Sequence, residues 1–187
     1  GTPASEILTS IVRLKNEHHI RDIHVEWSVN EKSAFEVALT NSYMGGRSTV
    51  SMKQVGLNVA SDSMMSAAYT GVKGGFIIIS ADDPGPHSSQ TEQDSRFFAM
   101  LAKIPCLEPQ NGQEAKDIIP EAFELSEELE LPVFVRITPR ICHSIYPVVL
   151  GDTVPIKREG KFEKDHERYV MISTYSRNRQ ELLNEKL

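Results

Sequence analysis

The apolar run "GFIIISA" at residues 75–81 places the strongest constraint on how this chain folds. A continuous apolar run without alternating polar residues is typical of a strand that is buried on both faces, as in the middle of a parallel sheet. Further strand-like segments occur at residues 23–29, 48–52, 104–108 and 132–138, with helical segments between them. Because strands that alternate with helices favour βαβ units, we expect an α/β fold with a parallel sheet flanked by helices.

The chain opens on the start of a helix, with Thr2 suited to the N-cap and Pro3 to the first helical position. An α/β domain rarely begins at a helix cap, so we expect a strand before Gly1 in a longer parent protein and a sheet of about five to six strands. Residues 1–144 then form the predicted α/β domain. Residues 145–187 are rich in Lys, Arg and Glu and poor in core residues, which is typical of a charged C-terminal extension or arm.

Composition argues against several classes of partner. The 187 residues carry a formal net charge of -6, so no general attraction to nucleic acid or to an anionic membrane is expected. The apolar runs are far shorter than the roughly 20 residues that cross a bilayer. Cys106 and Cys142 are isolated and lack the spacing of zinc or iron–sulfur ligands, and no secretory leader is visible. We therefore expect a cytoplasmic protein whose cysteines are reduced core residues.

Four polar segments follow the predicted strands, at residues 1–3, 30–32, 53–58 and 82–89. The carboxyl ends of parallel strands meet at one edge of a sheet, and ligands bind beyond that edge in this fold class. We therefore expect a single site there, built from Thr2, Glu31, Lys53, Asn58 and the residues of 82–89.

Glu31 has two interpretations. It falls in the first turn of a helix that Asn30 is suited to cap, where the helix dipole favours an acidic side chain for stability alone. A carboxylate in a cleft would also be able to hydrogen-bond a heterocycle nitrogen and move its proton. The residues alone leave both interpretations open.

The acidic loop after residue 81 also has several interpretations. Candidate ligands for a metal ion are present at Asp82, Asp83, His87, Glu92 and Asp94. Their spacing matches no known metal cage and two prolines favour a rigid turn, so we predict no metal ligands and expect Glu92 and Asp94 to start the next helix. Ser88 stands beside a histidine, but no third group orients that base and no G-x-S-x-G motif is present.

The sequence has neither a G-x-x-x-x-G-K-[ST] nor a G-x-G-x-x-G phosphate-binding motif. The tripeptide "GDT" at 151–153, with Asn178 further on, resembles the Gly-Asp-Gly…Asn signature that binds magnesium diphosphate in thiamine enzymes. The last glycine of that signature is missing, and a charged, proline-interrupted segment follows it instead of a helix. We interpret this match as a coincidence.

Four longer motifs resemble one family. They are "GTPASEIL" (1–8), "HVEWSVNEKSAFEVA" (24–38), "MKQVGLNVASDSMMSAAYTGVKGG" (52–75) and "ADDPGPHSSQTEQDSR" (81–96). These motifs are similar to the first domain of 2-oxoacid:ferredoxin oxidoreductases, and within that family to the alpha subunits that act on indolepyruvate. The resemblance covers residues 1–144 and, more loosely, 167–187.

This resemblance implies that the chain is the pyrimidine-binding half of a thiamine diphosphate site, shared with a second α/β domain that holds the magnesium diphosphate. It also implies that Glu31 is catalytic, because a glutamate there hydrogen-bonds the pyrimidine nitrogen and promotes loss of the thiazolium C2 proton. The implied cofactor-binding residues are Glu31, Lys53, Gly56 and Asn58. The implied substrate border consists of Thr2, Asp82, His87 and Ser88.

The implied reaction is the oxidative decarboxylation of a 2-oxoacid to an acyl-coenzyme A, with electrons passing to iron–sulfur clusters in a ferredoxin-type domain or subunit. Relatives that act on pyruvate carry an arginine where this sequence reads "SADDPG". An aryl pyruvate such as indolepyruvate is therefore the implied substrate, with His87 or Lys53 left to bind its carboxylate. Such domains usually pair, which implies a dimer and would suit a helix face that carries Met64, Met65 and Tyr69.

Two alternatives remain open. A non-catalytic or degenerate α/β module would dock to partner subunits without turnover, and a small metal hydrolase would use the acidic loop. On the main hypothesis the chain by itself is inactive, because its sequence lacks the diphosphate signature and the iron–sulfur ligands.

Overall fold

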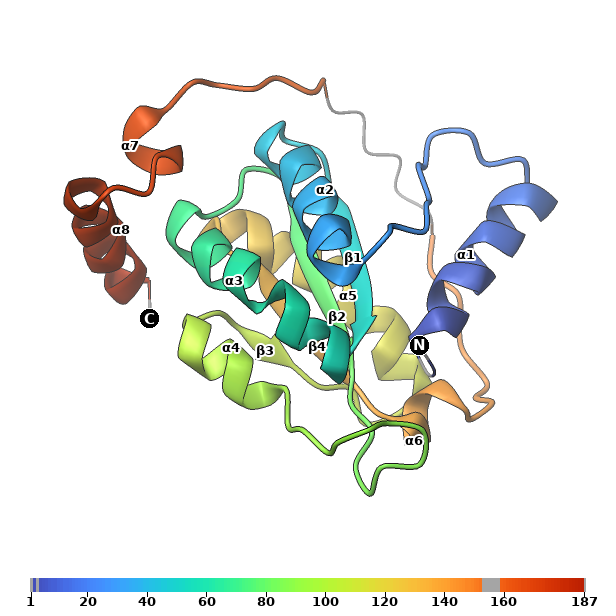
Figure 1. Cartoon of the computed structure of the whole chain (residues 1–187). Helices are drawn as coiled ribbons and strands as arrows, with labels where there is room; N and C mark the ends of the chain where they lie inside the picture. The colour runs from blue at the N-terminus through green and yellow to red at the C-terminus, as the bar shows by residue number, and fades with distance from the viewer. Residues whose placement is uncertain (1, 3, 153–158, 187) are drawn as a thin grey trace.

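The computed structural model describes residues 2, 4–152 and 159–186. Within them, the strands form one parallel sheet in the spatial order β1-β2-β4-β3. The strands are β1 (Ser48–Lys53), β2 (Phe76–Ala81), β3 (Cys106–Leu107) and β4 (Val133–Ile137). The predicted α/β fold is confirmed, but the described part of the chain has four strands rather than five to six (Figure 1).

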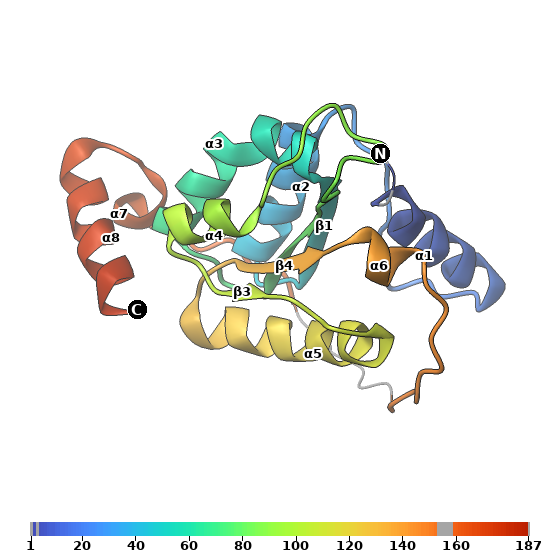
Figure 2. The same cartoon turned by 90° about the horizontal axis from the view of Figure 1, so that it is seen from below.

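Helices cover both faces of this sheet (Figures 1 and 2). They are α1 (Ser5–Glu17), α2 (Glu31–Tyr43), α3 (Gln54–Thr70), α4 (Arg96–Ala102), α5 (Gly112–Leu129), α6 (Pro139–Cys142), α7 (His166–Tyr169) and α8 (Ser173–Glu185). Side chains of α2, α3 and α4 form one core cluster with the sheet, and side chains of α1 and α5 form the other. In the described part of the chain, none of these helices has the length and the apolar character needed to cross a membrane.

The strand β2 lies in the middle of the sheet, as its apolar run predicts. All six of its residues are buried. Phe76 and Ile78 belong to the core beneath α2 and α3, whereas Ile77 and Ile79 belong to the core beneath α5. This alternation of side chains between the two faces explains why the strand has no polar residue along most of its length.

The prediction of a strand at residues 23–29 is wrong. The described structure has no strand there, and no backbone hydrogen bond joins this segment to the sheet. Trp27 is 63% exposed and Val29 is 93% exposed. An alternating apolar pattern specifies which side chains would face a core, but a strand also needs a neighbouring edge with which to pair.

The helices α7 and α8 pack against the carboxyl-terminal part of α3. The buried guanidinium of Arg168 donates to the backbone oxygens of Thr70 (2.8 Å) and Val72 (2.7 Å), and also to the carboxylate of Glu130 (3.2 Å). Arg179 of α8 donates to the backbone oxygen of Tyr69 at 2.7 Å. Two cationic side chains from the charged extension thus bind the last carbonyl groups of α3, where the helix dipole favours positive charge.

The helix face expected to suit a dimer contact is largely covered within the chain. Met64 is fully buried in the core, and the hydroxyl of Tyr69 donates to Gln180 of α8. The packing of α8 against α3 could not be read from the sequence, because it joins residues more than a hundred positions apart.

We expect Arg168→Ala to lower the free energy of unfolding by about 2–4 kcal/mol, because it removes a buried, charged donor of several hydrogen bonds. Urea denaturation measures this loss. Arg177→Ala, at an exposed position of α8, is the matched control and should stay within about 0.5 kcal/mol of the wild type. An Arg168→Ala protein as stable as the control would show that these contacts do not hold the extension in place.

Candidate functional site

Glu31 is the first residue of α2, and the predicted cap is confirmed. The side-chain oxygen of Asn30 accepts a hydrogen bond from the backbone N–H of Ser33 at 2.9 Å. This bond fixes the start of the helix and thereby the direction in which Glu31 leaves the backbone. The glutamate is half-buried, so its carboxylate lies at the border between the protein and its surroundings.

The side chain of Glu31 lies directly against Gly56 in the first turn of α3. A β-carbon added at Gly56 would lie 2.4 Å from Cγ and 2.7 Å from Oε1 of Glu31. Only glycine leaves this space open, because any other residue would displace the carboxylate. The structure thus joins two residues that the sequence placed in separate polar segments.

Lys53 and Gln54 occupy the junction between β1 and α3, and both point to the loop that follows β2. The ammonium of Lys53 is buried and donates to the backbone oxygen (2.7 Å) and hydroxyl (3.0 Å) of Ser88. The fully buried amide of Gln54 donates to the hydroxyl of Ser89 at 2.9 Å and to the backbone oxygen of Thr91 at 3.2 Å. The predicted ligand-facing lysine is therefore engaged within the protein.

The other predicted site residues lie in two places, one on α3 and the other at the loop that follows β2. Asn58 is exposed on α3, in the turn that also contains Gly56. Thr2 lies beside the loop, since its backbone oxygen is 3.5 Å from the hydroxyl of Ser88, and it precedes α1 rather than capping it. His87 is exposed in the same loop. The structure therefore brings Thr2 close to Ser88, which follows His87 in the loop.

Asp83, which the sequence resemblance did not assign to the substrate border, organises the loop at residues 82–95. Its buried carboxylate accepts hydrogen bonds from the hydroxyl of Ser89 (2.6 Å) and from the backbone N–H groups of Ser88 (2.9 Å) and His87 (3.3 Å). These bonds, led by that of Ser89, hold the pKa of Asp83 well below its ordinary value. The sequence signal for such a loop is an aspartate that directly precedes a Pro-Gly turn and is followed by several polar residues.

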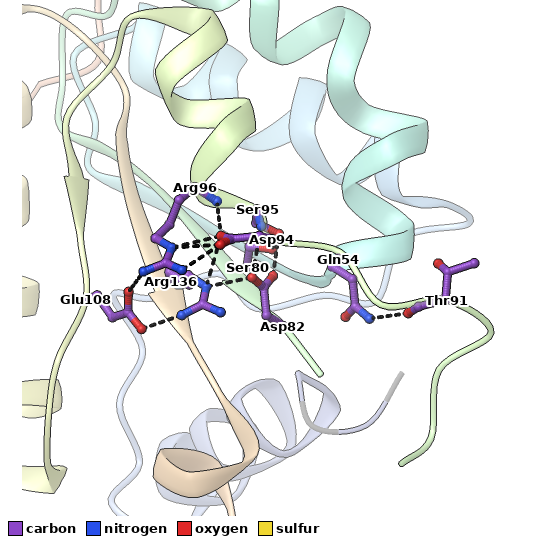
Figure 3. A network of polar contacts seen from close by, with 9 residues as sticks. All are labelled: Gln54, Ser80, Asp82, Thr91, Asp94, Ser95, Arg96, Glu108 and Arg136. Atoms are coloured by element: carbon purple, nitrogen blue, oxygen red, sulfur yellow. Dashed lines mark hydrogen bonds and ion pairs between the residues drawn. The ribbon is translucent and has the colours of Figure 1, made fainter. Parts of the chain in front are cut away.

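Asp82, expected at the substrate border, lies beneath it. It is fully buried, and Figure 3 shows its carboxylate in a network with Ser95 and Arg136. Arg136 donates to Asp82 at 2.6 Å, and the backbone N–H of Ser95 donates to it at 2.9 Å. The carboxylate is thus occupied by protein groups and joins the two ends of the 82–95 loop to the sheet.

The acidic residues that follow also act within the protein. The helix α4 begins at Arg96, so Glu92 and Asp94 precede it and the expectation that they start the helix is wrong. Hydrogen bonds from Arg96 lower the pKa of Asp94 to about 2. No group of three or more candidate ligands for a metal ion occurs among the described residues. Arg96 also pairs with Glu108, which extends the network in Figure 3.

Two other features lie away from this edge. A hollow of about 340 Å³, lined mainly by Met65, Tyr69, Leu101 and Leu183, lies between α3, α4 and α8, toward the end of α3 opposite Gly56. Asn178 lies on α8, and Thr153 of the "GDT" match lies outside the described residues.

Comparisons with known proteins agree with the sequence resemblance. Indolepyruvate oxidoreductase subunit IorA of Pyrococcus abyssi is 44% identical over 100% of this chain, which covers 29% of that protein. The same subunit of Methanothermobacter thermautotrophicus is 47% identical over 95% of the chain, which covers 28% of it. The chain therefore spans less than a third of the length of these curated relatives.

A solved structure shows the same fold. The 2-oxoglutarate:ferredoxin oxidoreductase of Magnetococcus marinus, with 2-oxoglutarate, coenzyme A and succinyl-CoA bound, matches 75% of this chain and 25% of its own, with a TM-score of 0.62 and 16% identity. A family model for the thiamine diphosphate-binding part of pyruvate flavodoxin/ferredoxin oxidoreductases matches residues 2–183. The chain therefore belongs to this family of thiamine diphosphate-binding oxidoreductase domains.

Proposed function

We propose that this chain binds the aminopyrimidine of thiamine diphosphate in a 2-oxoacid:ferredoxin oxidoreductase and that Glu31 is its catalytic residue. The observation that carries the proposal is the placement of the Glu31 carboxylate against the bare backbone of Gly56, at the start of two helices. The family match supports thiamine diphosphate as the ligand of this carboxylate, since the family is defined by thiamine diphosphate binding.

The residues fit the proposed cofactor. Glu31 presents a half-buried carboxylate, which is suited to accept a hydrogen bond from a protonated ring nitrogen. Gly56 lets that carboxylate lie directly against the backbone of α3, because a β-carbon at this position would overlap the Glu31 side chain. Asn58 offers an exposed amide in the same turn. We therefore assign Glu31, Gly56 and Asn58 to cofactor binding, with Lys53 behind them at the base of α3.

The chemistry divides between the cofactor and the protein. When bound, thiamine diphosphate would supply a nucleophilic carbon, the deprotonated thiazolium C2, and a ring able to delocalise the electron pair released when carbon dioxide leaves the 2-oxoacid. Glu31 holds a proton at the pyrimidine nitrogen and so favours the tautomer whose exocyclic nitrogen acts as a base. Thr2, His87 and Ser88 form the proposed substrate border, and Asp82 supports it from beneath.

We further propose the activity of the whole enzyme from its relatives. The IorA subunits are named for indolepyruvate, so an aryl pyruvate is the proposed substrate. The 2-oxoglutarate:ferredoxin oxidoreductase has coenzyme A and succinyl-CoA bound, which supports an acyl-coenzyme A as the proposed product. The chain covers 29% of such a subunit, which leaves room for a domain that binds the magnesium diphosphate and a ferredoxin-type domain with iron–sulfur clusters. A dimer is the proposed assembly and the cytoplasm the proposed location, where free cysteines such as Cys106 and Cys142 are usual. Cys106 is exposed and Cys142 is half-buried, so the expectation that both are core residues is wrong.

We expect Glu31→Gln in the assembled enzyme to lower 2-oxoacid-dependent ferredoxin reduction by on the order of 10²–10⁴-fold, because an amide cannot take the proton that the carboxylate holds. Exchange of the thiazolium C2 proton, followed by NMR, should slow in parallel. Glu36→Gln is the matched control, since Glu36 lies on the same helix with a half-exposed side chain. Exchange at the wild-type rate in Glu31→Gln would refute the catalytic role.

We expect Gly56→Ala to lower kcat by on the order of 10²-fold, because the new methyl group would displace the Glu31 carboxylate from its position. Steady-state kinetics at saturating thiamine diphosphate measures the effect. In Gly160→Ala, the added methyl group meets its nearest neighbour, Met44, at an ordinary 3.7 Å, which makes this variant the control. Wild-type kcat in Gly56→Ala would mean that the position of Glu31 is not critical.

A further inference from the structure

The 82–95 loop is held from inside by two buried charges that the proposed chemistry does not use. Asp83 is 1% exposed, and Lys53 is 7% exposed. The nearest atoms of the two charged groups are 3.8 Å apart. A buried ion of either sign is costly unless it is paired and hydrogen-bonded, so this arrangement needs a structural or functional reason.

The two charges converge on one short stretch of the loop. Asp83 accepts hydrogen bonds from His87, Ser88 and Ser89, which are consecutive in sequence. Lys53 donates to the backbone oxygen and the hydroxyl of the middle residue, Ser88. The backbone of Ser88 is therefore bound on both sides, with its N–H on the carboxylate and its oxygen on the ammonium.

This stretch faces outward where the substrate border is proposed. His87 and Ser88 are exposed, although their backbone groups are bound to buried side chains. The hydroxyl oxygen of Ser88 lies 3.5 Å from the backbone oxygen of Thr2 and 3.4 Å from Oδ2 of Asp83. Its single proton can be donated to either of these oxygens. Ser88 thus joins the loop to the segment before α1.

Lys53 also connects the loop to Glu31. It immediately precedes α3, whose first turn contains Gly56 beneath the Glu31 side chain. The next residue, Gln54, binds the loop again at Ser89. One short segment of backbone therefore fixes both the proposed catalytic carboxylate and the proposed substrate border.

We infer that Asp83 and Lys53 are positioning residues that set the place of His87 and Ser88 relative to Glu31 and so determine how well the 2-oxoacid fits. This inference rests on the proposed function and adds to it two residues that act through others. Neither charged group needs to touch the substrate, because both are buried and engaged within the protein.

The test compares Asp83→Asn, Lys53→Met and the double variant in the assembled enzyme. Each single variant leaves one buried charge without its partner and should lose stability, whereas the double variant should regain part of it. In all three, KM for the 2-oxoacid should rise by about tenfold or more, since the border no longer has a fixed position, and in Asp83→Asn kcat should change little. Amide hydrogen exchange at residues 87–89 should become faster in all three.

A double variant that regained both stability and the wild-type KM would overturn the inference, because the pair would then be merely structural. Unchanged amide exchange at residues 87–89 would overturn it as well. Asp117→Asn is the matched control, since that carboxylate pairs with Lys116 at 2.7 Å on the surface of α5, and it should alter neither KM nor exchange.

The proposed function fails on a different measurement. Glu31→Gln tests it through exchange of the thiazolium C2 proton. That exchange should stay within about twofold of the wild type in Asp83→Asn, because a positioning residue of the border does not act on the cofactor. A large loss of C2 exchange in Asp83→Asn would place the effect at the cofactor and overturn the inference.

Discussion

The strand β2 has a parallel neighbour on each side, and helices cover both of its faces. It pairs with β1 along one edge and with β4 along the other, and all of its residues are buried. Since the three strands run in the same direction, they end at one edge of the sheet, at Lys53, Ala81 and Ile137. Polar side chains that follow β1 and β2 must therefore gather in one place, which is where the 82–95 loop meets the start of α3.

The first charged residue beyond β2 is still inside the protein. Asp82 is fully buried and depends on Arg136 of the neighbouring strand, because an unpaired carboxylate there would cost several kcal/mol. Ser95 binds the same carboxylate from the far end of the loop. The two adjacent aspartates thus bind different parts of the protein. Asp82 joins the ends of the loop to the sheet, and Asp83 binds the backbone in the middle of the loop.

Features that depend on near neighbours in the chain were predictable from the sequence. The apolar run of β2 and the cap at Asn30 are of this kind, since each follows from a few consecutive residues. Features that depend on distant partners were not. Residues 23–29 alternate like a strand but make no backbone hydrogen bond to the sheet in the described structure, and the burial of Asp82 depends on an arginine 54 positions away. Likewise, the contact of Glu31 with Gly56 follows from how α2 and α3 pack, which no local pattern encodes.

The helix α3 links the candidate site to the charged extension. Its first turn carries Gly56 beneath Glu31, and its last carbonyl groups accept hydrogen bonds from Arg168 and Arg179. The helix has 17 residues and spans the distance between these two sets of contacts. A shift of α3 along its axis would break the arginine contacts at one end and displace Gly56 from Glu31 at the other. The extension and the candidate site thus contact opposite ends of the same helix.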